Sequence, residues 1–141
     1  MDKDKILQIV VKLINDTKDG TLVWQRISMH EDYCDDKSSD QSFLFLYIKT
    51  YIESAMFSDL RIDTLNSYFT SINKGFFYLF RFKDNYERSE VSDMYDLAFQ
   101  SNSHAKVQSF KVDTKDILRI NNIIETYIDN NEGFLSSFLA D

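Results

Sequence analysis

Apolar residues recur at helical spacing in the first part of the chain. Over residues 3–17 they stand three and four positions apart, at Ile6, Ile9, Val10, Leu13 and Ile14. A 3.6-residue helix places positions with this spacing on one face. The pattern therefore predicts a helix over residues 3–17. Gly20 would end it, because the left-handed position after a helix favours glycine.

Alternating positions follow this helix and predict strands. Residues 21–27 are the first predicted strand, and residues 29–42 are polar and acidic, as expected of a loop. Residues 42–52 are a second strand candidate, which we favour over a helix because β-branched and aromatic residues dominate there. The sequence leaves the structure of residues 53–66 open.

Two hairpins are predicted in the second half of the chain. Residues 67–72 and 76–83 flank Asn73-Lys74-Gly75, a short loop with the glycine that such turns favour. Residues 94–100 and 106–112 form the other pair. Together with the earlier candidates they predict an antiparallel sheet.

Six of the seven residues from Phe76 to Phe82 are apolar or aromatic, which indicates a central strand of that sheet. Side chains alternate between the two faces of a strand. We expect the first set to meet the helices and the second to run out toward solvent. The two sets are Phe76, Tyr78, Phe80 and Phe82 on one face, and Phe77, Leu79, Arg81 and Lys83 on the other.

The C-terminal region predicts a helix that starts near Asp113 or Thr114, with Asp116 favourable in its first turn. Its apolar face comprises Ile117, Ile120, Ile124, Tyr127 and Ile128. Asn130, Asn131 and Gly133 are expected to break it. A final short helix with its own apolar face would then carry Phe134, Leu135, Phe138 and Leu139.

These elements indicate one α+β domain over residues 1–141. The expected architecture is an antiparallel sheet of four to six strands, with the N- and C-terminal helices packed on one face. Aromatic residues make up 15% of the chain, a content that favours a folded core over disorder.

The charge balance narrows the range of partners. The formal net charge is −7, which opposes binding to a nucleic-acid backbone. Acidic residues gather in the predicted loop before the second strand, and such a field favours partners with a basic surface. The predicted contact residues are Glu31, Asp32, Tyr33, Asp35 and Asp36.

The single cysteine, Cys34, permits no intramolecular disulfide, in keeping with a reducing compartment. The sequence has no signal-peptide pattern and no uncharged apolar run near the ~20 residues that a membrane span needs. We therefore expect a cytoplasmic protein that binds neither nucleic acid nor membranes.

Catalytic and metal-binding patterns are weak. His30 and Cys34 stand beside several carboxylates, but structural zinc sites take four well-spaced Cys or His ligands, and His104 is the only other histidine. Acidic neighbours should raise the pKa of the Cys34 thiol, which opposes its use as a nucleophile. No phosphate-binding glycine motif is present in a chain with three glycines. We expect no enzyme activity, no metal and no cofactor.

The order of the elements resembles a class of small uncharacterised proteins of low-GC bacteria and their phages. The resemblance rests on Ile14 to Gly20 leading into Leu22-Val23-Trp24, on Met94 to Phe99, and on the helix from Ile120 to Ile128 with the segment Phe134 to Leu139. Several members of this class are immunity or anti-defence factors. The resemblance thus implies a role as an inhibitor that acts by protein contact.

Two other function classes stay open. One is a pocket that binds a small ligand such as a nucleotide signal, with Trp24 or Arg81 as its anchor, because an aromatic or guanidinium plane stacks on a base. The other is a homo-oligomeric structural protein that pairs through exposed aromatic residues or its C-terminal helix.

Overall fold

The computed structural model describes residues 2–27, 60–63, 65–84, 94–102, 105 and 107–140. Within them, two helices and six strands form an α+β fold, which confirms the predicted class. The elements are α1 (Lys3–Lys18), β1 (Gln25–Arg26), β2 (Leu60–Ile62), β3 (Tyr68–Ile72), β4 (Gly75–Asp84), β5 (Met94–Gln100), β6 (Gln108–Ser109) and α3 (Thr114–Ala140).

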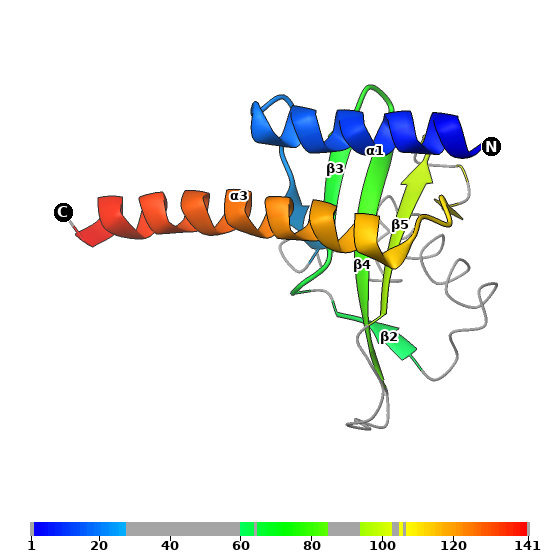
Figure 1. Cartoon of the computed structure of the whole chain (residues 1–141). Coiled ribbons are helices and arrows are strands. Elements are labelled where there is room, and N and C mark those ends of the chain that lie inside the picture. The colour runs from blue at the N-terminus through cyan, green and yellow to red at the C-terminus, as the bar shows by residue number, and fades with distance from the viewer. Residues whose placement is uncertain are drawn as a thin grey trace.

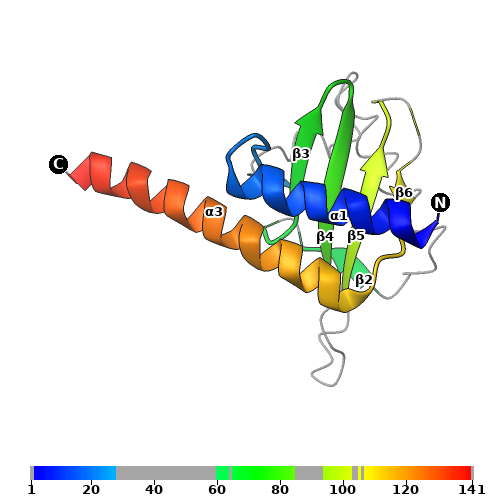
Figure 2. The ribbon, with the colours of Figure 1, turned by 45° about the horizontal axis from the view of Figure 1, so that its top comes forward.

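All described strand pairs are antiparallel, in the order β1-β3-β4-β5-β6. β4 is the central strand: β3 pairs with its first half, β2 with its last residues, and β5 with most of its other edge. Both helices lie side by side on the same face of this sheet (Figures 1 and 2).

The β3–β4 hairpin forms where the sequence predicts it. The turn consists of Asn73 and Lys74, and Asn73 has a φ of +55°, a left-handed conformation that asparagine tolerates. Gly75 follows directly and faces a close backbone. A Cβ at Gly75 would lie 2.7 Å from the carbonyl oxygen of Gln100 on β5, so only glycine fits this position without a backbone shift.

The first helix also follows its prediction. Its N-cap is Asp2, whose carboxylate accepts a hydrogen bond of 2.7 Å from the backbone N–H of Lys5. Its last residue is Lys18, Asp19 is the C-cap, and Gly20 has the predicted left-handed φ of +83°. The described strands are shorter than expected in two places, because β1 spans only Gln25–Arg26 and β6 only Gln108–Ser109. The predicted loop at 29–42 and strand at 42–52 lie outside the described residues.

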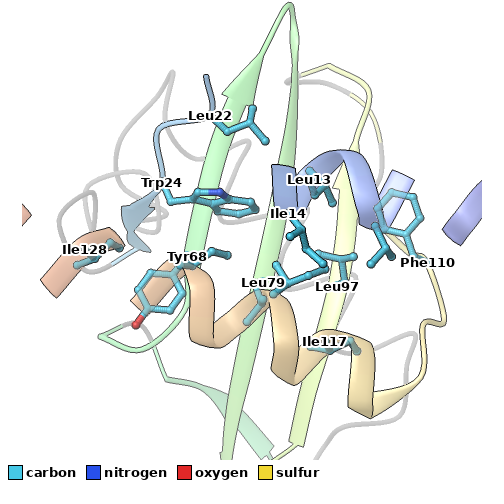
Figure 3. Packing of buried hydrophobic residues seen from close by; sticks show 13 residues of the cluster. Leu13, Ile14, Leu22, Trp24, Tyr68, Leu79, Leu97, Phe110, Ile117 and Ile128 are labelled. Atoms are coloured by element: carbon cyan, nitrogen blue, oxygen red, sulfur yellow. The ribbon is translucent and has the colours of Figure 1, made fainter. Parts of the chain in front are cut away.

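Trp24 joins the start of the sheet to α1. Trp24 is 2% exposed and lies among the buried side chains of the core (Figure 3). Its Nε1 donates a hydrogen bond of 2.8 Å to the hydroxyl of Thr17. That hydroxyl in turn donates to the carbonyl oxygen of Leu13, at 2.6 Å. The buried polar atom of the tryptophan therefore has a partner inside the core.

The expected orientation of β4 is wrong. Leu79 and the half-buried Phe77, not Phe76, Tyr78, Phe80 and Phe82, pack toward the helices, together with Leu97 and Ile117 (Figure 3). The even-numbered aromatic residues form a second buried cluster with Ile27, Ala98 and Val107 on the opposite face. Strand alternation separates the two faces correctly, but both are apolar, so alternation alone cannot say which one carries the helices.

The predicted break in the C-terminal helix is also wrong. α3 runs without interruption for 27 residues through Asn130, Asn131 and Gly133. These residues disfavour a helix by only about 0.5–1 kcal/mol each, which does not suffice to end one. The last part of α3 continues past the sheet and projects away from it (Figure 1).

Replacing Thr17 by valine should lower the free energy of unfolding by about 1–3 kcal/mol, because the buried indole N–H loses its acceptor. Urea denaturation measures this change. Thr126→Val is a matched control, since Thr126 also donates to the carbonyl four residues earlier but is exposed. Its cost should stay below about 0.5 kcal/mol. Equal losses for the two variants would contradict the role given to the Trp24 bond.

Candidate functional site

The acidic segment predicted to bind a partner lies outside the described residues. This applies to Glu31, Asp32, Tyr33, Asp35 and Asp36, and equally to His30, Cys34 and His104. Their use in partner binding stays a prediction.

The two proposed ligand anchors, Trp24 and Arg81, lie in different environments. Trp24 belongs to the core and is only 2% exposed, so its ring offers almost no surface on which a ligand could stack. Arg81 is half-buried on β4, and its guanidinium lies 5.7 Å from the centre of the Tyr95 ring. Alternation places Arg81 on the helix side with Leu79, but no described interaction brings it together with Trp24.

The face of the sheet opposite the helices also carries hydrogen-bonded polar side chains. The Tyr78 hydroxyl donates to Gln100 Oε1 at 2.6 Å, and the Ser109 hydroxyl donates to Asp96 Oδ1 at 2.9 Å. Burial raises the pKa of Asp96 to about 6, although hydrogen bonds from Ser109 and the backbone of Leu97 oppose the shift.

A carboxyl with a raised pKa is one component of an acid–base site. A reaction also needs a second group and a place for a substrate, and the contacts of Asp96 supply neither. In the part of the chain that the structure describes, no three His, Cys, Asp or Glu side chains gather as a metal site. The described chemistry on this face fits a buried polar pair in a core.

The strongest unusual feature is the end of α3, residues 129–140, which we call the arm. Every residue of the arm is exposed. Four of them are large and apolar: Phe134 is 70% exposed, Leu135 58%, Phe138 70% and Leu139 83%. Exposed apolar groups that gather in this way mark interaction surfaces, whereas single ones are common on any protein.

The apolar residues of the arm continue the face of α3 that packs on the sheet. Leu135 follows the buried Ile128 by seven residues, about two turns, and Phe138 follows the buried Ile120 by eighteen residues, about five turns. One stripe thus runs along the whole helix. It is covered by the sheet and α1 up to Ile128, and it is bare beyond that residue.

Arg26 fixes α3 to the sheet at the point where the arm begins. Its Nε donates to Glu132 at 3.0 Å, its Nη1 donates to the carbonyl oxygen of Leu65 at 2.8 Å, and its Nη2 lies 3.9 Å from Asp129. The guanidinium also lies over the ring of Tyr68, at 5.6 Å from the ring centre. Of these contacts, those with Glu132 and Asp129 join β1 to α3 where the arm begins, whereas those with Leu65 and Tyr68 hold the Arg26 side chain in place.

The arm and β1 border a shallow groove of about 340 Å³. Its lining residues are Trp24, Gln25, Arg26, Ile128, Asn131, Glu132 and Leu135. The base of the bare stripe therefore opens into a concave surface. The stripe and the groove together suit an apolar contact with another protein.

Sequence reasoning identified Phe134, Leu135, Phe138 and Leu139 as an apolar face, but assigned them to a separate helix. It therefore missed that the face lies uncovered on a continuous one. The spacing of seven residues between Ile128 and Leu135 was the available signal, since it places both in the same stripe.

Comparison of the chain with protein-family models, curated proteins and solved structures finds no match. Among the described helices, none combines the length and the hydropathy needed to cross a membrane.

Asp96→Asn should change how stability depends on pH. Because burial raises the pKa of the folded carboxyl to about 6 from 3.8, its protonation favours the folded state at low pH, and this advantage is lost as the pH rises through 6. Between about pH 4 and pH 7, the free energy of unfolding of the variant should rise by on the order of 1–3 kcal/mol relative to that of the native chain. Urea denaturation across this range measures the gain, and parallel pH profiles would contradict it.

Arg26→Ala should lower the free energy of unfolding by about 1–2 kcal/mol. The reason is that the Leu65 carbonyl loses its hydrogen-bond donor and the Tyr68 ring loses its cation–π contact. Glu132→Gln should cost less than about 0.5 kcal/mol, since that carboxylate is exposed. Lys12→Ala, which removes an exposed ion pair with Asp16, is the control of similar small cost. If Glu132→Gln lowered the free energy of unfolding as much as Arg26→Ala, the ion pair with α3, rather than the contacts with Leu65 and Tyr68, would account for the stability that Arg26 contributes.

Proposed function

We propose that this chain is a non-enzymatic binding protein that acts by protein–protein contact, with the arm of α3 as its principal contact surface. The observation that supports this is the bare stripe of Phe134, Leu135, Phe138 and Leu139. From their exposed fractions, these side chains present on the order of 400–500 Å² of apolar surface. That area approaches the largest apolar patches of ordinary monomers, which are often functional.

The energetic argument also favours a partner. At about 25 cal/mol per Å², covering such a stripe contributes on the order of 10 kcal/mol before the costs of association. Within the part of the chain that the structure describes, the apolar stripe of this twelve-residue helical extension stays exposed, so the extension gains mainly from its intrinsic helix propensity, which is marginal in water. A contact along the stripe supplies the packing that the arm lacks.

The acidic segment Glu31 to Asp36 is proposed as a second contact that steers a basic partner toward the protein. An immunity or anti-defence inhibitor in the cytoplasm is the role that combines protein contact with the absence of catalytic motifs in the sequence. Inhibition of this kind needs a rigid surface that occupies its target, and it needs no reaction.

Photo-crosslinking tests the role of the arm. p-Benzoylphenylalanine introduced at Phe138 should form an ultraviolet-dependent adduct with another polypeptide in cells that express the protein. The matched control carries it at Leu7, which is 54% exposed on α1 and lies off the stripe. The mass of the adduct identifies what was captured. Absence of any adduct at Phe138, or equal labelling at Leu7, would contradict the proposal.

A further inference from the structure

We propose that the partner of the arm is the arm of a second copy of this chain, so that two molecules pair along their stripes in an antiparallel, two-fold symmetric dimer. This inference rests on the proposed use of the arm as a contact surface. It adds the identity of the partner at the arm, which is separate from the basic partner proposed for the acidic segment Glu31 to Asp36, and the geometry of the pair.

The area available fits a small but specific dimer. Two stripes of on the order of 400–500 Å² each would bury about 800–1,000 Å², which approaches the roughly 1,000 Å² expected of a specific interface. The groove beside β1 adds to this area, because it opens at Ile128 and Leu135 at the base of the stripe. In a two-fold pair each copy offers both a stripe and a groove, so the contact is self-complementary.

The charges on α3 favour a like partner over a basic one. From Gly133 to Ala140 the helix has no charged side chain, and the carboxylates of Asp129 and Glu132 already face Arg26 of the same chain. A partner recognised by its positive charge would find no free acid along the stripe. Two chains of net charge −7 repel each other least where their contact surfaces carry no charge.

The position of the sheet relative to α3 favours an antiparallel arrangement of the two α3 helices. The sheet and the bare stripe lie on the same side of α3, with the sheet covering that side up to Ile128. In a parallel pair the two sheets would have to occupy the same space between the helices. In an antiparallel pair each sheet lies beyond the end of the other arm (Figure 1 shows the free space along the arm).

The spacing along the stripe suits a paired helix. Ile124, Ile128, Asn131, Leu135 and Phe138 follow one another at intervals of four, three, four and three residues, the repeat of packed helix pairs. Asn131 is the one polar residue in this series, and a single polar seam residue restricts the register of such pairs. Beyond Glu132 the opposite side of the arm carries only small side chains, at Gly133, Ser136, Ser137 and Ala140.

Sedimentation equilibrium from about 1 to 200 µM tests the dimer directly. The native chain should approach twice its mass of 16.7 kDa as its concentration rises. Phe138→Glu should weaken association by on the order of 100-fold, as expected for an anchor at the centre of a small interface. Leu7→Glu is the matched control, because it places the same charge at an exposed apolar position on α1. Circular dichroism shows whether each variant stays folded.

Cysteine crosslinking tests the geometry. In a Cys34→Ser background, Leu135→Cys should give a disulfide-linked dimer on mild oxidation, because two-fold pairing near this position brings the two Cα atoms within the roughly 7 Å that a disulfide spans. Ser137→Cys, on the opposite side of the same arm, should crosslink much more slowly.

The salt dependence of association distinguishes a second copy of this chain from a basic protein partner. Screening weakens the repulsion between two negative chains, so added salt should strengthen the dimer, whereas it would weaken a complex with a basic protein. A native chain that stays monomeric over the whole range overturns the inference. So does a dimer that Phe138→Glu leaves intact, or equal crosslinking at the two cysteine positions. A Phe138 photo-adduct with a different protein would overturn the dimer while leaving the proposed function in place.

Discussion

The apolar stripe of α3 is the contact on which the rest of the structure depends, because it closes the helix side of the sheet. Ile117, Ile120, Ile124 and Ile128 enter the same core as Leu79 and Leu97 of the two central paired strands. α1 fills the remaining space on that face and is tied to β1 through the Thr17–Trp24 hydrogen bond. The stripe then runs on for about 18 Å past Ile128, at 1.5 Å per residue, with no cover from the described chain.

This arrangement joins stability and binding in one element. Up to Ile128 the stripe stabilises the domain, and beyond it the same chemistry faces solvent. Arg26 stands at the boundary between the two parts, where it holds Leu65, Tyr68 and the carboxylates of α3. A rigid start gives the arm a defined direction, which lowers the entropy that a partner must overcome on binding.

The sequence predicts the local elements well and their mutual arrangement less well. The α1 stripe, Gly20 and the Asn73-Lys74-Gly75 turn depend on short-range geometry, and each appears where its pattern places it. The face of β4 that meets the helices depends on contacts between distant segments, and both faces of that strand are apolar. The continuity of α3 through Gly133 likewise outweighs weak local preferences. No local pattern could show that Phe138 is bare, since burial is a property of the assembled fold.

Hydrogen exchange of the α3 amides at two protein concentrations tests the central claim most directly. In dilute solution the amides of Ile117 to Ile128 should be protected, while those of the arm exchange quickly because every described residue of the arm is exposed. At high concentration the arm amides should gain protection as a second copy covers the stripe, and Phe138→Glu should abolish this gain. Arm amides that exchange at the same rate at both concentrations would contradict the account.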